Sequence, residues 1–268
     1  MTALLEVEDL TVRFGDQVVV DQVSFTLERG ARLGIIGESG SGKTLTALSV
    51  IGLVPDFARV SGSVRLDGRQ LLGRRDSDLA QLRGEQIAMV FQNPQTALNP
   101  LMRVGKQIAE PLRRHRGLSK VDAADAAVSL CERVGLPDPS RAVRAYPHQL
   151  SGGQRQRVGI AIAVACRPAL LIADEPTTAL DVTVQAGVLR LLSELVAEQD
   201  TALLFITHDI ALVPLVADDV LVMRRGAIVE SGTAGSIIDG PSHPYTVELL
   251  AAARKTALPP DERLEVIS

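Results

Sequence analysis

The sequence has few cysteines, no long apolar run and no signal-like N-terminus, which are features of disulfide-rich, membrane-spanning and secreted proteins. It has only two cysteines, Cys131 and Cys166, with no metal-ligand spacing between them, and both lie in apolar helical patterns. We therefore expect buried free thiols in a reducing compartment. The longest apolar run, 158–166, has nine residues, about half of what a membrane-spanning helix needs. The N-terminus has no basic region followed by an apolar run, so we expect no secretory signal and a soluble, cytoplasmic protein.

Charge and repetition exclude further classes. The 268 residues carry a formal net charge of −4, which argues against general nucleic-acid binding because that function favours basic surfaces. There is no internal repeat and no low-complexity tract, and only the segment around Pro259–Arg263 has a loosely ordered composition. A hydrophobic content of 46% is enough for a large core.

The order of the elements predicts an α/β fold. Short β-branched segments with glycine turns fill the first third and predict antiparallel strands, helical patterns dominate from Ala80 to Ala165, and strand and helix alternate afterwards. We expect a mostly parallel core sheet, an antiparallel β subdomain and an inserted α-helical subdomain. The predicted strands are Leu4–Glu8, Thr11–Phe14, Val18–Val20, Val23–Leu27, Arg32–Ile36, Ser63–Leu66, Ala169–Ala173, Ala202–Ile206 and the hairpin from Asp219 to Glu230; the predicted helices are Thr44–Ile51, Lys106–Leu112, Ser119–Val134, Gln154–Ala165, Val182–Glu198 and Ala211–Val216.

The segment 37–44 matches the phosphate-binding pattern G-x-x-x-x-G-K-[ST] in full, between a predicted strand and a predicted helix. Glycines let the backbone amides converge on one point, and the helix N-terminus adds partial positive charge there. A chance glycine turn is the alternative, but four fixed positions in this setting disfavour it. The expected ATP contacts are Gly37, Glu38, Ser39, Gly40, Ser41, Gly42, Lys43, which reaches the phosphates, and Thr44, whose hydroxyl suits Mg²⁺.

Two more motifs carry chemistry. The predicted strand that starts at Ala169 ends in Asp174, placed to hold Mg²⁺, and Glu175, placed to activate water; alone, this pair would more often be a solvated acidic turn. The string Leu150-Ser151-Gly152-Gly153-Gln154 opens a helix and predicts a second phosphate cradle, with an ordinary serine N-cap as the alternative.

With these three motifs in this order, nearly the whole chain resembles the ATP-binding subunits of ABC transporters. The resemblance implies a single P-loop NTPase domain, with 1–92 and 166–232 as core and β subdomain, 93–165 as helical subdomain and 233–268 as C-terminal tail. It also implies roles for Gln92 as a contact of Mg²⁺ and water, and for His208 at the γ-phosphate. Phe14, 29 positions before Lys43, would stack on adenine. Without the family, His208 reads as a capping or core histidine and Phe14 as a core residue of a strand.

The resemblance further implies a mechanism. Two ATPase subunits, identical or paralogous, meet head to tail, so that each ATP also contacts the other subunit. Glu175, His208 and Gln92 are the implied catalytic residues, and Thr44, Gln92 and Asp174 the implied Mg²⁺ ligands. Hydrolysis separates the two halves, and the motion passes to two permease subunits near Gln92. The implied contacts across the dimer are Ser151, Gly152, Gly153, Gln154 and Asp181 in Ala179-Leu180-Asp181.

Three segments resemble the oligopeptide, dipeptide and nickel importer subgroup: Phe91–Pro100, Tyr146–Gln149 and the tail Gly240–Leu250. This implies a peripheral protein on the cytoplasmic face of the membrane and an extracytoplasmic solute-binding protein that selects a peptide, a related small solute or nickel. We interpret the tail as a packing element, and His148 and His243 as structural. No cysteine follows Cys166, so we expect no iron–sulfur cluster.

Three other functions are compatible with an ATP-binding cassette but fit the sequence less well. Soluble ABC ATPases of DNA repair or translation carry long insertions or two cassettes, whereas here about 110 residues separate Gly42 from Gly152. A regulatory module without turnover is disfavoured because Glu175 and His208 are both present. An exporter is disfavoured by the importer-like segments.

Overall fold

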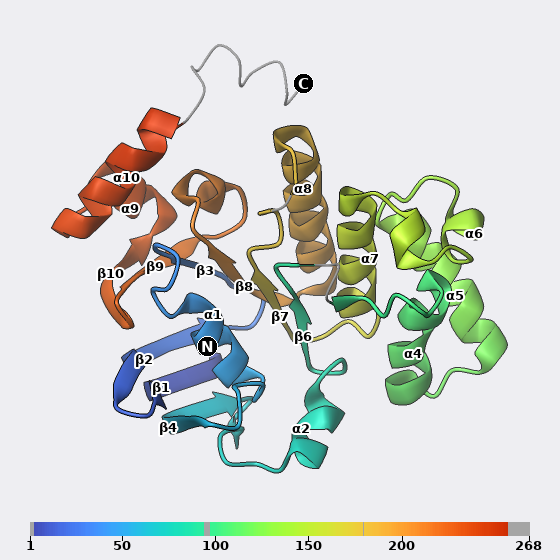
Figure 1. Cartoon of the computed structure of the whole chain (residues 1–268), viewed down its shortest axis with the longest axis horizontal. Helices are drawn as coiled ribbons and strands as arrows, with labels where there is room; N and C mark the ends of the chain where they lie inside the picture. The colour runs from blue at the N-terminus through green and yellow to red at the C-terminus, as the bar shows by residue number, and fades with distance from the viewer. Residues whose placement is uncertain (1–2, 94–96, 179, 257–268) are drawn as a thin grey trace. The chain divides into compact units, whose positions relative to one another are not determined.

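A computed structural model describes residues 3–93, 97–178 and 180–256 (Figure 1). Its contacts divide the chain into two units: Met1–Asp76 with Ala202–Ser268, and Ser77–Thr201. Parts of three predicted features lie outside the described residues: 94–96 of the segment 91–100, Ala179, and the segment around 259–263. The proposed subdomain boundaries at 92/93, 165/166 and 232/233 stay predictions.

An antiparallel sheet forms the first part of the first unit, in the order β2-β1-β4-β5. The predicted short strands join into longer ones, because the chain passes through irregular pairs without leaving the sheet: Asp9 and Gln22 both have positive φ, at 49° and 47°, as bulge positions do. The antiparallel pairing is confirmed. The bounds are β1 (Ala3–Phe14), β2 (Gln17–Glu28), β4 (Ala58–Leu66) and β5 (Arg69–Gln70).

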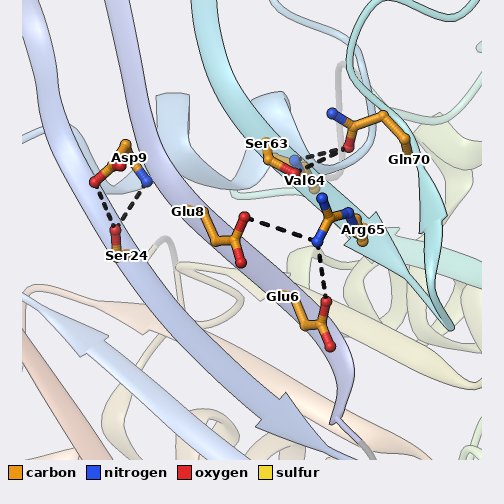
Figure 2. Close-up of polar contacts among 8 residues, drawn as sticks. All are labelled: Glu6, Glu8, Asp9, Ser24, Ser63, Val64, Arg65 and Gln70. Atoms are coloured by element: carbon orange, nitrogen blue, oxygen red, sulfur yellow. Dashed lines mark hydrogen bonds and ion pairs between the residues drawn. The ribbon is translucent and has the colours of Figure 1, made fainter.

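Polar side chains tie these strands together at the surface (Figure 2). Arg65 on β4 has its Nη1 atom 3.8 Å from carboxylate oxygens of both Glu6 and Glu8 on the neighbouring β1. Ser24 on β2 accepts a hydrogen bond from the amide of Asp9 at 2.8 Å. Exposed ion pairs of this kind contribute little stability, roughly 0–1 kcal/mol each. Their main effect is to favour one register of the strands.

A second sheet in the first unit has the order β10-β9-β3-β8, with β3 parallel to both neighbours and β9 and β10 forming the predicted hairpin. Strand β8 is buried along its whole length, which explains its continuous apolar run. The apolar helices that follow cover part of this sheet. The bounds are β3 (Arg32–Ile36), α1 (Lys43–Val50), β8 (Ala202–Thr207), η2 (Ile210–Leu215), β9 (Asp219–Arg224), β10 (Ala227–Thr233), α9 (Ala234–Asp239) and α10 (Pro244–Thr256).

The second unit is mainly helical and contains one parallel pair, β6 with β7. The predicted start of a helix at Ser119 is confirmed, because its side chain accepts from the amide of Asp122 at 3.1 Å. The apolar stripe of α8 is buried at Val188, Leu192 and Leu195. Both cysteines are buried and free, as predicted. The bounds are α2 (Asp76–Leu82), β6 (Ile87–Val90), α4 (Val104–Arg116), α5 (Lys120–Arg133), α6 (Pro139–Ala142), η1 (Pro147–Gln149), α7 (Gly152–Val164), β7 (Leu170–Asp174) and α8 (Val182–Gln199).

Candidate functional site

The glycine-rich loop follows β3 directly and leads into α1, as the sequence predicts. Gly37 has φ 152°, and a Cβ placed on it would lie 2.1 Å from the carbonyl oxygen of Met223. Gly42 has φ 102°, and its Cβ would lie 2.9 Å from the carbonyl oxygen of Val19. Since real Cβ contacts are not this short, the two fixed glycines of the motif are required by neighbouring backbone.

Lys43 is almost fully buried, with 4% of its surface exposed. Its ammonium donates hydrogen bonds to the carbonyl oxygens of Gly37 at 2.8 Å and Glu38 at 2.9 Å. The lysine side chain therefore folds back on its own loop, and its charged ammonium group lies beside the loop carbonyls. A charge in this place suits the phosphate chain of a nucleotide.

Two further features of the loop fit a phosphate group. The hydroxyl oxygen of Ser41 is buried and has no hydrogen-bond partner among the described residues, a cost that an anionic ligand would relieve. Helix α1 has Gly42 as its N-cap, without a side-chain cap and without an acidic residue in its first turn. No acidic side chain offsets the partial positive charge of this helix start, which therefore favours an anion.

In the second unit, β7 ends at Asp174, which is 3% exposed, and Glu175 follows it. The side-chain amide of Gln92 donates to Oε2 of Glu175 at 2.8 Å, and the hydroxyl of Thr178 donates to the same atom at 2.9 Å. Glu175 has φ 45°, a left-handed conformation that is costly for a residue with a Cβ. Such strain often marks functional positions. The structure thus brings two of the predicted catalytic residues together.

The structure confirms the capping interpretation of the Ser151 string, and the phosphate cradle stays a prediction. Ser151 is the N-cap of α7: its hydroxyl accepts from the amide of Gln154 at 3.3 Å, while Oε1 of Gln154 accepts from the amide of Ser151 at 2.9 Å. Gly153 is needed for packing, since a Cβ there would lie 2.7 Å from Cγ1 of Val184. Ser151 is nevertheless exposed, so a ligand can reach this helix start.

The remaining predicted residues lie at element ends. Asp181 caps α8 by accepting from the amide of Val184 at 3.0 Å, and His208 follows β8 as an exposed residue. Phe14 ends β1, half-buried, with its ring centroid 5.5 Å from that of Phe57. Sequence reasoning missed Phe57, which is 77% exposed and lies far from any motif.

Few of the described side chains are placed to bind a metal ion. Among the described residues, no group of three or more histidine, cysteine or acidic side chains could hold a metal ion. A metal here must take much of its shell from water or a ligand, which is how Mg²⁺ binds with nucleotides. Thr44 is exposed at the start of α1 and offers a hydroxyl oxygen, and Asp174 offers a carboxylate in the other unit. Each of these oxygens, taken singly, is of the hard type that Mg²⁺ prefers.

No helix within the part of the chain that the structure describes is long and apolar enough to cross a membrane.

Comparison with known proteins gives consistent results. The family profile described as ABC transporter matches residues 20–178. The oligopeptide transport ATP-binding protein OppD of Salmonella typhimurium is 49% identical over 253 residues, 93% of this chain and 76% of that protein. The dipeptide transport ATP-binding protein DppD of Escherichia coli is 47% identical over 255 residues, covering 93% and 78%. A dimeric post-hydrolysis structure of the ATP-binding cassette MJ0796, bound to ADP and Pi, superposes with a TM-score of 0.76 at 27% identity, covering 86% of this chain and 98% of that one.

Proposed function

This chain belongs to the ABC transporter family, and on that premise we propose that it is the ATP-hydrolysing subunit that energises a membrane importer of peptides. The observation that carries the proposal is the carboxylate of Glu175, which accepts hydrogen bonds from Gln92 and Thr178 and belongs to a residue with a strained backbone. A nucleotide-binding module without turnover would have no need for this arrangement.

In this proposal the glycine-rich loop holds the phosphates of ATP. The ammonium of Lys43 exchanges its bonds to the loop carbonyls for bonds to phosphate oxygens, which are charge-assisted and therefore stronger. Ser41 gains a partner for its buried hydroxyl. Phe14 supplies an aromatic surface for the adenine. Thr44, Asp174 and Gln92 provide protein oxygens for Mg²⁺, which when bound neutralises charge on the phosphates.

Glu175 is the proposed general base. Its Oε2 atom accepts hydrogen bonds from Gln92 and Thr178, so the carboxylate is held in one orientation before a water arrives. Gln92 contacts this carboxylate through the same amide group that would sense Mg²⁺ and the permease. His208 is the proposed contact of the γ-phosphate. Rearrangement at Gln92 would therefore change the position of the base.

Pairing of two ATPase subunits completes each site in the proposal. The exposed start of α7 presents Ser151, Gly152 and Gly153 to the nucleotide of the other subunit, with Gln154 keeping the helix start in shape. Asp181 lies at the corresponding start of α8. The comparison cassette MJ0796 was solved as a dimer with ADP and Pi, which supports a paired arrangement.

The proposed permease contact lies beside Gln92. Phe91 and Leu101 expose 39% and 88% of their surfaces, and a small apolar pocket opens between β6 and α7. Phe91 lines this pocket and is also exposed, so the surface next to Gln92 offers apolar groups to a partner. We assign this surface to a cytoplasmic segment of the permeases, which places the chain at the cytoplasmic face of the membrane. The pocket is lined by Met89, Val90, Phe91, Ala97, Leu98, Gln156, Gly159 and Ile162.

Uptake by the host organism tests the function. Deletion of the gene is expected to abolish ATP-dependent uptake of labelled dipeptides and oligopeptides, and the wild-type gene should restore it while Glu175→Gln should not. The variant keeps the shape of the side chain and removes the base. Uptake that survives deletion, or that the variant restores, contradicts the proposal. Loss of ⁶³Ni²⁺ uptake with normal peptide uptake would replace the peptide assignment by nickel.

A further inference from the structure

The tail after β10 contains the helix α10, whose tyrosine is the largest fully buried side chain of the described residues. Tyr245, in the first turn of α10, is 2% exposed. It belongs to an apolar cluster with Ile36 at the end of β3 and Val222 on β9, and Leu250 on the next turns of α10 joins the same cluster. The predicted packing role of the tail is therefore confirmed, and α10 can be followed in red in Figure 1.

The hydroxyl group of this tyrosine also makes a hydrogen bond to the glycine-rich loop. The hydroxyl oxygen of Tyr245 accepts a hydrogen bond from the backbone amide of Glu38 at 3.0 Å. That amide belongs to the second residue of the glycine-rich loop. The guanidinium of Arg224 lies over the ring, 4.6 Å from its centroid. Burial, the largest influence, raises the pKa of Tyr245 above its ordinary value, so the hydroxyl is neutral at physiological pH.

The geometry of the peptide bond connects this contact to Lys43. The amide of Glu38 and the carbonyl of Gly37 form one planar unit, and in a trans peptide they point in opposite directions. The carbonyl of Gly37 accepts from the ammonium of Lys43 at 2.8 Å. Tyr245 on one side and Lys43 on the other therefore hold the same peptide plane.

Local contacts fix the place of Tyr245 itself. Its own amide donates to Nδ1 of His243 at 3.2 Å. The carboxylate of Glu230 on β10 accepts from the amides of Ser242 at 2.6 Å and His243 at 3.2 Å. Burial is the largest influence on Glu230 and would raise its pKa, but the hydrogen bonds that the carboxylate accepts lower the pKa below its ordinary value, which keeps the carboxylate charged. The turn before α10 is thus anchored to the hairpin that borders the loop.

We propose that Tyr245 is a positioning residue for the phosphate-binding loop, and that α10 thereby sets the orientation of the Gly37–Glu38 peptide and of the lysine bonded to it. The inference rests on the proposed function, in which this loop binds ATP. A Tyr245→Phe change leaves the ring and the packing but deprives the Glu38 amide of its partner. The peptide plane can then rotate, and Lys43 loses a fixed acceptor.

The full-length chain, purified by itself, allows a direct test. Affinity for a fluorescent non-hydrolysable Mg–ATP analogue, hydrogen exchange at the Glu38 amide and the thermal midpoint are measured together. For Tyr245→Phe we expect the Kd to rise about three- to tenfold, as for loss of one hydrogen bond, with faster exchange at Glu38. Leu250→Ala is the packing control: it should lower the midpoint and leave the Kd within about twofold. Tyr146→Phe removes a tyrosine hydroxyl elsewhere in the chain and should change neither the Kd nor the exchange rate at Glu38.

Two results would overturn the inference: a Kd and a Glu38 exchange rate for Tyr245→Phe that equal those of the wild type, or a loss of affinity in Leu250→Ala as large as in Tyr245→Phe. The first result would mean that the hydroxyl of Tyr245 does not position the loop. The second would mean that α10 affects the loop only through general packing. If the wild-type chain does not bind the analogue and Lys43→Ala behaves identically, the proposed function fails instead. Exchange at Glu38 then still decides whether the tyrosine contact exists.

Discussion

Replacing Gly37 by alanine adds a single carbon atom, the Cβ, to the glycine-rich loop and so tests the geometry of the loop. The new Cβ would lie 2.1 Å from the carbonyl oxygen of Met223 and 2.8 Å from the hydroxyl oxygen of Ser41, whereas ordinary contacts begin at 3.4 Å. The loop or the end of β9 must therefore move by more than an ångström. Gly40 offers the matched control, because its φ is 80° but a Cβ there would meet no atom within 4 Å.

The expected magnitudes differ between the two variants. Gly40→Ala carries only the penalty of a positive φ, about 1 kcal/mol. Gly37→Ala adds a backbone clash, so we expect a loss of about 3 kcal/mol in unfolding free energy. For a chain of this size, these losses correspond to thermal midpoints lower by roughly 2 °C and 5 °C. Because the sequence has no tryptophan, far-ultraviolet circular dichroism is the suitable probe.

Affinity for Mg–ATP should follow the same order, with at least about a tenfold loss for Gly37→Ala, since the displaced carbonyl of Gly37 is an acceptor of Lys43. Equal midpoints for the two variants would refute the reasoning. So would a Gly37→Ala protein with wild-type stability and affinity, because the loop would then tolerate the Cβ that the structure forbids.

The remaining predictions concern other parts of the chain. Ser151→Arg should leave the ATP affinity of the isolated chain within about twofold, while loss of the helix cap lowers the stability by about 1 kcal/mol. In the assembled transporter the same variant should lower the rate of phosphate release more than about tenfold. A normal rate of release would refute a contact of Ser151 across the dimer. Burial raises the pKa of Cys131 to about 11 and also raises that of Cys166, so neither should react with a thiol reagent at pH 8 in the native protein, while two thiols should react in denaturant. Because the folded pKa of Cys131 exceeds the usual 9.0, the stability linked to it is complete below pH 9 and lost as the pH rises through 11; native reactivity at pH 8 would contradict this.

Local pattern was enough to predict much of the fold. The strand β3 has the predicted bounds, and α1 begins one residue before the predicted start, because a strand, a glycine loop and an apolar helix each leave a signal within a few residues. The helix starting after Ser119 has its capping signal beside it. Helix α2 was not predicted, and the helical character expected from Ala80 onward is wrong at strand β6; with seven and four residues, both elements are too short to show a period.

The long-range contacts of the site were beyond sequence reasoning. The bond between Gln92 and Glu175 joins residues 83 positions apart, and that between Tyr245 and Glu38 joins residues 207 positions apart. A motif names Glu175, but only the fold shows that Thr178 also holds its carboxylate. Ser151 shows another limit: the structure confirms its side chain as a helix cap, whereas its exposure alone does not show the contact with phosphate that the motif predicts.

The central claim is that this chain hydrolyses ATP with Glu175 as the base. The most direct measurement is phosphate release from Mg–ATP by the chain assembled with its permeases, compared between wild type and Glu175→Gln together with the ATP affinity of each. The account predicts equal affinity and a rate for the variant lower by at least about a hundredfold. A variant that releases phosphate at the wild-type rate would contradict it.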